Sequence, residues 1–105
     1  MKKYIVNITD KAISDLSEIV NYISDSLFAP DAAHRLYIRI ADEIESLDEF
    51  PERYAVVLSE PEHSMKIRRT SVDNYSIFYH VGENVTILRI LYSASDISER
   101  LLSGR

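Results

Sequence analysis

The N-terminal quarter of the chain changes from an alternating pattern to a helical one. In residues 2–8, KKYIVNI, apolar and other side chains alternate, which predicts a β-strand. Thr9 follows as a suitable helix N-cap, with Asp10 in the first turn. Apolar residues then recur at spacings of three and four. They predict an α-helix with one apolar stripe, formed by Ile13, Leu16, Val20, Ile23 and Leu27.

A second helical pattern begins at Pro30, which fits the first helical position because no backbone N–H is needed there. Pro51 is expected to end this helix. The short connection between the two helices predicts an antiparallel hairpin. Each stripe covers fewer than three heptads, so packing onto a sheet is favoured over a coiled-coil dimer. The second stripe consists of Ala33, Leu36, Ile40, Ile44 and Leu47.

After Pro51 the period changes to two. Residues 54–58, 65–72, 75–81 and 85–92 are expected to form four strands, with turns in the segments SEPEH, DN and GEN. In 75–81, Tyr75, Ile77, Tyr79 and Val81 are expected to face one side of the sheet, and Ser76, Phe78 and His80 the other. In 85–92, Arg89 is expected on the same side as Val85, Ile87 and Leu91.

The segment SDISERLL, residues 95–102, predicts a short C-terminal helix. The predicted fold is therefore α+β: an N-terminal strand, an antiparallel two-helix hairpin, then antiparallel strands in a twisted sheet and the C-terminal helix. With 105 residues and no repeats or linkers, residues 1–105 are expected to form a single domain.

Composition excludes several classes of function. The chain has no cysteine, which excludes disulfides and cysteine-based zinc sites, and the three histidines have no metal-like spacing. We therefore expect no metal and no cofactor. No apolar stretch reaches the 18 or so residues of a membrane span, and the N-terminal apolar run is too short for a secretory signal, so a cytoplasmic location is expected.

The net charge of −5 is unevenly distributed along the chain. Residues 1–60 hold six Lys or Arg against twelve Asp or Glu, whereas residues 61–92 hold four against three. A protein that grips a phosphate backbone usually has a clear basic excess. Any anion-binding surface is therefore expected in the C-terminal half, and it is small.

Three cations cluster in the predicted strand 65–72. Lys66 and Arg68 are expected to share one face, while Arg69 points to the other. They fit a patch that binds phosphate or carboxylate, or a solvated strand face with one outlying cation. Both interpretations are open from the pattern alone.

Arg89 is a lone charge in the apolar run VTILRILY. Burying it without a partner would cost several kcal/mol, so it needs a carboxylate or a ligand. A salt bridge to Glu43 or Glu45 and a working cation at the edge of a groove are equally consistent with the sequence. His80, in the neighbouring predicted strand, is a candidate general base near neutral pH.

Three stretches together resemble the RelE/ParE superfamily of bacterial toxins: YIVNITDKAISDLSEIVNYI, APDAAHRLYIRIADEIESLDEFPERY and MKIRRTSVDNYSIFYHVGENVTILRILYSASD. The resemblance covers Tyr4 to about Asp96. Its most specific parts are a helix with Ala12, Asp15-Leu16, Ile19 and Tyr22-Ile23, the stop Leu47…Phe50-Pro51, and the sheet pattern IRR…V.NY.IFY.V…V.ILRIL.

The resemblance implies the toxin of a type II toxin–antitoxin module, neutralised by a cognate antitoxin that is extended and partly disordered. An acidic antitoxin segment would suit the arginines and would fold as it binds. The implied antitoxin- or target-binding residues are Lys66, Arg68, Arg69, Arg89 and Tyr92. The resemblance also implies indirect association with DNA through the antitoxin, and it is compatible with a homodimer.

Members of the superfamily differ in target. ParE-like toxins poison DNA gyrase, and RelE-like toxins cleave mRNA in the ribosomal A site. The two long helices and the ILRIL strand look closer to ParE. RelE-like nucleases carry an arginine where this chain has Ser76. Their second cation and a Tyr or His near the C-terminus would fall near Ser95 and Leu101, and at least two of these groups are missing from this chain. Tyr92 stands where histidine is common in ParE-like relatives.

We therefore expect a gyrase-binding toxin. The alternatives are a ribosome-dependent endoribonuclease, with Arg68, His80, Arg89 and Tyr92 as catalytic candidates beside Lys66, or a degenerate toxin that only binds antitoxin.

Overall fold

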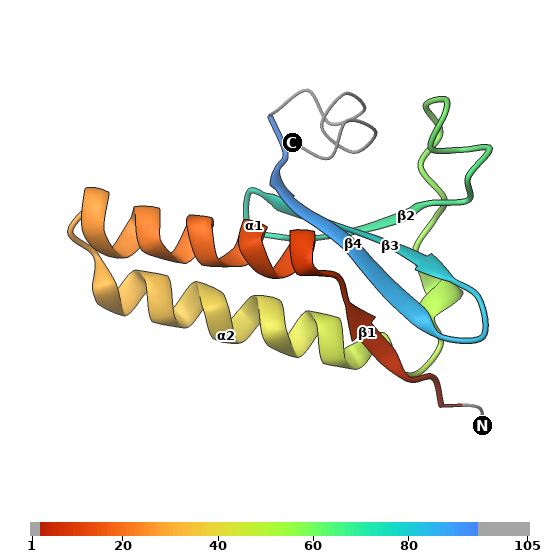
Figure 1. Cartoon of the computed structure of the whole chain (residues 1–105), viewed down its shortest axis with the longest axis horizontal. Helices are drawn as coiled ribbons and strands as arrows, with labels where there is room; N and C mark the ends of the chain where they lie inside the picture. The colour runs from red at the N-terminus through yellow and green to blue at the C-terminus, as the bar shows by residue number, and fades with distance from the viewer. Residues whose placement is uncertain (1–2, 95–105) are drawn as a thin grey trace.

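The computed structural model describes residues 3–94, in which two long helices lie side by side against a twisted sheet (Figure 1). The predicted α+β class and the helix pair are confirmed. The predicted C-terminal helix, residues 95–102, lies outside the described residues. The elements are β1 (Val6–Ile8), α1 (Asp10–Asn21), the π-helical turn η1 (Tyr22–Ser26), α2 (Pro30–Ser46), the 3₁₀ turn η2 (Pro51–Arg53), β2 (Arg68–Val72), β3 (Tyr75–Val81) and β4 (Val85–Tyr92).

The sheet has the strand order β1-β4-β3-β2. The last three strands are antiparallel neighbours, as predicted, with Val72 opposite Tyr75 and Val81 opposite Val85 next to the two turns. β1 pairs with β4 in parallel, Val6 opposite Val85, so the sheet is mixed. The first and last described strands therefore lie side by side, which places the start of α1 against β4.

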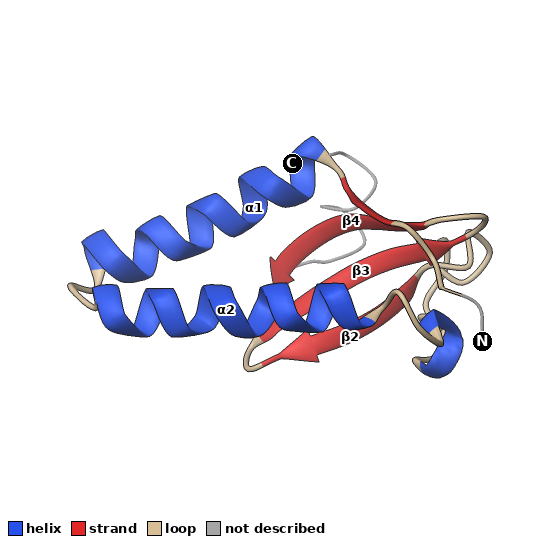
Figure 2. Cartoon of the chain, turned by 90° about the horizontal axis from the view of Figure 1, so that it is seen from below, coloured by secondary structure: helices blue, strands red, loops and turns tan. Residues whose placement is uncertain are grey.

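Both helices cover one face of the sheet, as Figure 2 shows for α2 crossing β2 and β3. The α2 stripe predicted from the sequence is buried in full. The alternation predicted for β3 is also confirmed, because Ile77 and Tyr79 join the core under the helices while Phe78 belongs to a cluster on the other face. We call that other face, which lies away from α1 and α2, the open sheet face. The core consists of Ala12, Leu36, Ile40, Ile44, Leu47, Val72, Ile77, Tyr79, Val85, Ile87 and Ile90.

The buried side of α1 is rotated from the predicted stripe. Ile13 and Leu27 are about half exposed, whereas Ala12 and Asp15 are buried. The buried stripe includes the charged Asp15. Apolar residues at helical spacing therefore predicted a stripe at the neighbouring positions instead. The inward position of Asp15 is the feature of α1 that matters most for the site.

α2 ends at Ser46, before Pro51 is reached. The Arg53 guanidinium lies beneath this end and donates hydrogen bonds to the carbonyl oxygens of Ser46, Glu49 and Phe50. The Ser46 carbonyl is one of the last four of α2, which have no partner inside the helix. Pro51 opens η2 instead of ending α2 directly.

The predicted strand 54–58 does not form, and the strand predicted from residue 65 begins at Arg68. Residues 60–66 fold into successive turns, and hydrogen bonds run from Ile67 N to the Glu62 carbonyl and from Val57 N to the Ile67 carbonyl. Of the expected strand, a single bridge from Val56 to Arg68 is present. Lys66 therefore stands in a turn with a φ of 57°, and it does not share a strand face with Arg68.

Candidate functional site

A β-bulge in β4 decides where Arg89 points. Tyr79 pairs with Ile87 and Phe78 pairs with Arg89, so Leu88 is an extra residue in β4. The alternation of side chains reverses there. The Arg89 side chain therefore leaves the strand on the open sheet face, as that of Phe78 does. The prediction that Arg89 shares a face with Ile87 is wrong.

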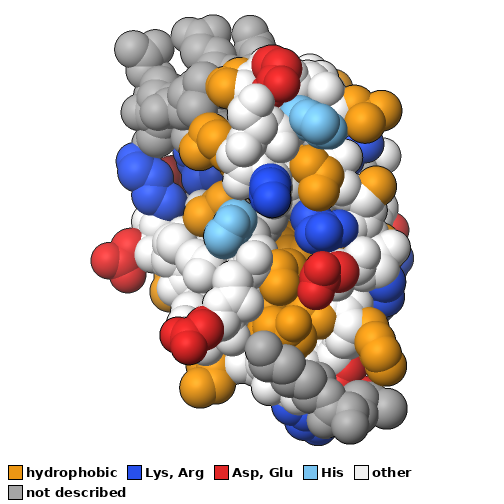
Figure 3. Space-filling view, turned by 90° about the vertical axis from the view of Figure 1, so that its right-hand side faces the viewer, with side chains coloured by type: hydrophobic (Ala, Val, Ile, Leu, Met, Phe, Trp, Pro, Cys, Tyr) orange, Lys and Arg blue, Asp and Glu red, His pale blue; other side chains and the backbone are white. Residues whose placement is uncertain are grey.

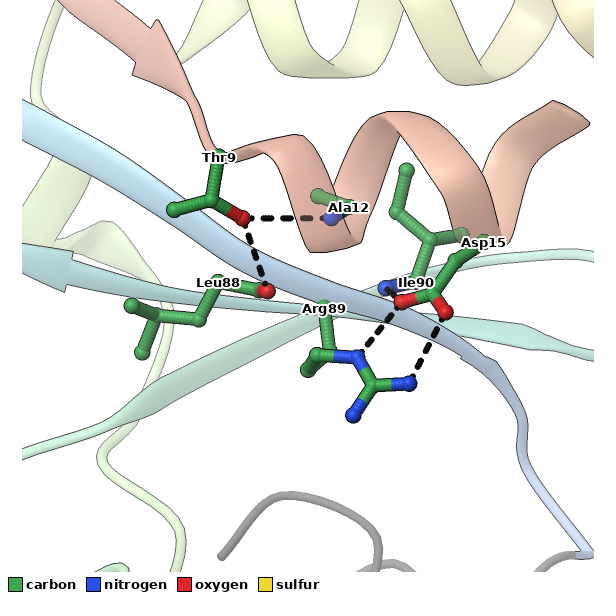
Figure 4. A network of polar contacts seen from close by, with 6 residues as sticks. All are labelled: Thr9, Ala12, Asp15, Leu88, Arg89 and Ile90. Atoms are coloured by element: carbon green, nitrogen blue, oxygen red, sulfur yellow. Dashed lines mark hydrogen bonds and ion pairs between the residues drawn. The ribbon is translucent and has the colours of Figure 1, made fainter. Parts of the chain in front are cut away.

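Arg89 forms a buried ion pair with Asp15 of α1 (Figure 4). Its Nε and Nη2 donate to the two carboxylate oxygens at 2.7 and 2.9 Å, and the two residues are 5% and 7% exposed. The hydrogen bond with Asp15 raises the pKa of Arg89, against the lowering effect of burial. Of the two interpretations left open by the sequence, the salt bridge is confirmed, but its partner is neither Glu43 nor Glu45: Glu43 accepts a hydrogen bond from Thr70 instead.

The same segment of α1 also completes the edge of β4. β1 ends at Ile8, and beyond that point Thr9 Oγ1 donates to the Leu88 carbonyl at 3.1 Å. The Ile90 amide then donates to Asp15 Oδ2 at 3.0 Å. Thr9 also accepts from Ala12 N at 3.1 Å, which confirms it as the N-cap (Figure 4). The side chains of Thr9, the N-cap of α1, and of Asp15 thus replace the strand neighbour that β1 no longer provides.

The open sheet face carries a small apolar cluster with polar residues around it. Its buried members are Ile67, Phe78 and Leu91. Ser76, the position at which the resemblance implied an arginine in nucleases, is fully buried, and its hydroxyl pairs with that of Ser93 at 2.8 Å. Arg69 and His80 are exposed, and alternation places both on this face. Figure 3 views the end of the molecule with the β3–β4 turn and shows Lys, Arg and His side chains beside hydrophobic ones.

Arg68 lies on the helix side of β2, opposite Tyr79. Its guanidinium donates to the carbonyl oxygens of Glu52 and Tyr54 at 3.2 and 2.7 Å. It therefore ties β2 to the segment after α2, whereas the Arg69 side chain has no hydrogen bond or ion pair to another residue within 3–94. The two adjacent arginines differ in what they contact and in which face they occupy.

Tyr92 does not join the cations of the open sheet face. It pairs with Tyr75 across β3 and β4, and the two rings meet edge to face with their centroids 5.8 Å apart. Both line a pocket with residues of α1. The five residues predicted to bind antitoxin or target are thus split among a turn, the two faces of the sheet and a buried ion pair.

Sequence reasoning gave Asp15 no role. The residue lay within the family pattern, but its partner is far along the chain. The signal was present in two places: a carboxylate between apolar positions of a helix, and a lone arginine within an apolar strand. Buried charges of opposite sign in one small core are expected to pair.

Among residues 3–94, no group of three His, Asp or Glu side chains is arranged to hold a metal ion. Within the same range, no helix is both long and apolar enough to cross a membrane.

Comparisons with known proteins give a consistent answer. A model of the family described as ParE toxin of type II toxin-antitoxin system, parDE, matches residues 6–97. A search of curated proteins found no match. The fold resembles that of a chain from the chromosomal ParDE toxin–antitoxin system of P. aeruginosa, with a TM-score of 0.71 and 24% identity over 86% of this chain and 96% of that one.

A second solved structure shares the fold at greater distance. It is the toxin–antitoxin complex RelBE2 from Mycobacterium tuberculosis, with a TM-score of 0.64 and 20% identity over 90% of this chain and 97% of that one. The family match spans nearly the whole chain, and both structural likenesses agree with it. The chain belongs to the ParE toxin family of type II toxin–antitoxin systems.

Proposed function

We propose that this toxin acts by binding a protein target, DNA gyrase, in the cytoplasm, and that a cognate antitoxin holds it inactive. The family match supports a toxin of the ParE type. The net charge of −5 also favours a protein target over the phosphate-rich ribosomal A site.

The observation that carries the proposal is the engagement of Arg89 by Asp15. Both carboxylate oxygens of Asp15 are bonded to the guanidinium, and the pair is buried. Cleavage of RNA requires cations aimed at the charge that develops on the scissile phosphate. Arg89 is turned instead toward the interior, and Ser76 offers a buried hydroxyl in place of a cation.

The open sheet face is the proposed binding surface. Arg69 on this face and Lys66 in the turn before β2 are exposed and would attract an acidic segment of the antitoxin or a complementary patch of the target. Arg68 and Arg89 act indirectly, since they fix the strands that carry this surface. The two similar solved structures belong to toxin–antitoxin systems, which supports an antitoxin partner for this chain.

The test is DNA supercoiling by purified gyrase in the presence of the purified toxin. We expect inhibition by the wild type and weaker inhibition by Arg69→Ala. The matched control is Arg35→Ala, which removes an exposed positive charge from α2 and is expected to inhibit as the wild type does.

Primer extension on mRNA from cells that express the toxin separates the alternatives. Intact supercoiling with growth arrest and cleaved mRNA would overturn the proposal in favour of a ribonuclease that uses His80 or Tyr92. Absence of growth arrest by the folded wild type would overturn it in favour of a protein that only binds antitoxin.

A further inference from the structure

Three tyrosines line an open pocket where the end of α1 overhangs β3 and β4. The pocket has a volume of about 460 Å³ and lies outside the open sheet face, which is the proposed antitoxin- and gyrase-binding surface. We call it the tyrosine pocket. Its lining residues are Glu18, Ile19, Tyr22, Tyr75 and Tyr92.

The aromatic rings form walls rather than a closed stack. Tyr75 and Tyr92 are 5.8 Å apart with an angle of 64° between the ring planes. Tyr22 and Tyr92 are 56% and 49% exposed, so both rings present surface to an incoming group. The pKa of Tyr75 is raised, first by burial and then by Tyr92 and Tyr22, which agrees with all three phenols facing a common space.

A change in helix type fixes the position of Tyr22. It is the first residue of the π-helical turn η1, and its carbonyl accepts a hydrogen bond from Leu27 N, five residues ahead. The Ile23 carbonyl accepts from Ala29 N. Short π-helical segments are frequent at functional sites. Here the segment lies at the pocket, between the end of α1 and the turn to α2.

The charge around the pocket favours a cation. Glu18 is exposed and contributes a carboxylate, and no Lys or Arg within residues 3–94 lines the pocket. Arg89 interacts electrostatically with Glu18, but it is already paired with Asp15 in a buried ion pair. An anion would meet Glu18 and the negative ring faces. A purely apolar side chain would leave Glu18 and the phenols without a partner on binding.

We propose that the tyrosine pocket binds an arginine or lysine side chain presented by a protein partner. The faces of aromatic rings attract such cations, and several rings around one space form the kind of aromatic cage that recognises them. The Glu18 carboxylate would accept hydrogen bonds from the guanidinium or ammonium group. This site is distinct from the proposed antitoxin- and gyrase-binding surface, and it does not depend on the choice of target.

The test uses three blocked tripeptides that differ in the central residue: Gly-Arg-Gly, Gly-Lys-Gly and Gly-citrulline-Gly. Citrulline keeps the shape of arginine without its charge. The readout is the chemical shift of tyrosine ring protons in the full chain. We expect saturable shifts at Tyr22, Tyr75 and Tyr92 with one or both cationic peptides, and much smaller shifts with citrulline.

Variants locate the binding. Tyr22→Leu and Glu18→Gln alter exposed side chains, so both are expected to fold, and each is expected to weaken binding several-fold. The matched control Tyr37→Leu removes an exposed tyrosine from α2 and is expected to bind as the wild type does. Equal shifts with citrulline, no saturable shift with either cation, or unchanged binding by folded Tyr22→Leu would each overturn the proposal.

Discussion

Asp15 holds Arg89 through two hydrogen bonds of 2.7 and 2.9 Å, although the residues stand 74 positions apart in the chain. One carboxylate oxygen also accepts a hydrogen bond from the Ile90 amide. The Asp15 side chain therefore both pairs with the buried charge of Arg89 and satisfies a backbone donor at the edge of β4. The pair fixes α1 against β4 and, through β4, positions the open sheet face that we propose as the binding surface.

Removing either partner should destabilise the fold strongly. Arg89→Ala or Asp15→Ala leaves an uncompensated buried charge, at a cost of about 3–5 kcal/mol. The double variant should cost less than the sum of the two, because neither charge then remains alone. Denaturation by urea gives all three values. As a control, Asp42→Ala removes an exposed carboxylate from α2 and should stay within about 0.5 kcal/mol of the wild type. An Arg89→Ala variant as stable as this control would refute a structural role for the pair.

The Thr9 hydroxyl makes two hydrogen bonds, one as donor and one as acceptor, and Thr9→Ser should retain both. Thr9→Ala removes the cap on Ala12 N and the donor to the Leu88 carbonyl, which should lower the free energy of unfolding by about 1–2 kcal/mol. Chemical denaturation measures the loss, and hydrogen exchange at the Ala12 amide should quicken in the alanine variant alone. If serine were as damaging as alanine, the hydroxyl would not be the stabilising group.

Tyr79 should make the fold sensitive to alkaline pH. Its hydroxyl donates to the Pro51 carbonyl at 2.6 Å, and burial raises its pKa from 10.0 to about 12. Below pH 10 the phenol is neutral in both states, so this source of stability is fully present. Between pH 10 and about 12 the unfolded chain ionises first, and stability should fall by about 1.4 kcal/mol per pH unit from this group.

Tyr79→Phe tests that assignment. The variant should be about 1–3 kcal/mol less stable at neutral pH, because the Pro51 carbonyl loses its donor, but it should lose less stability between pH 10 and 12. Tyr37→Phe, which alters an exposed tyrosine, should keep the alkaline loss of the wild type. Urea denaturation across this pH range checks both variants, and an unchanged slope in Tyr79→Phe would assign the loss to other tyrosines.

Substitutions of Arg68 and Arg69 should have different effects: the first should lower stability and the second should lower activity. Arg68→Ala breaks the bonds to the Glu52 and Tyr54 carbonyls and should cost about 1.5–3 kcal/mol. Arg69→Ala should change stability by less than about 0.5 kcal/mol, yet weaken growth arrest because an exposed cation of the binding surface is lost. Denaturation and growth after induced expression give the two readouts. Full toxicity of Arg69→Ala would remove this residue from the surface.

Local periodicity was sufficient for the elements whose pattern is uniform. The α2 stripe from Ala33 to Leu47 and the alternation of β3 were predicted residue by residue, because a regular helix or strand repeats the same burial at a fixed spacing. The Thr9 cap was predicted for a similar reason, since its bond to Ala12 spans one helical turn. The resemblance to the RelE/ParE superfamily, read from the same residues, led to the family that the comparisons show.

Tertiary structure decided what the pattern left open. An extra residue at Leu88 reversed the faces of β4, and no periodic rule places such a bulge. The turns of residues 60–66 took Lys66 out of the strand, and the end of β1 at Ile8 opened the edge that Thr9 and Asp15 complete. The sequence by itself determined the two long helices, the approximate positions of β1 to β4 and that Arg89 needs a partner. Only the packing of α1 against β4 selected Asp15, because that choice depends on which carboxylate reaches the buried cation in space, and position along the chain does not encode it.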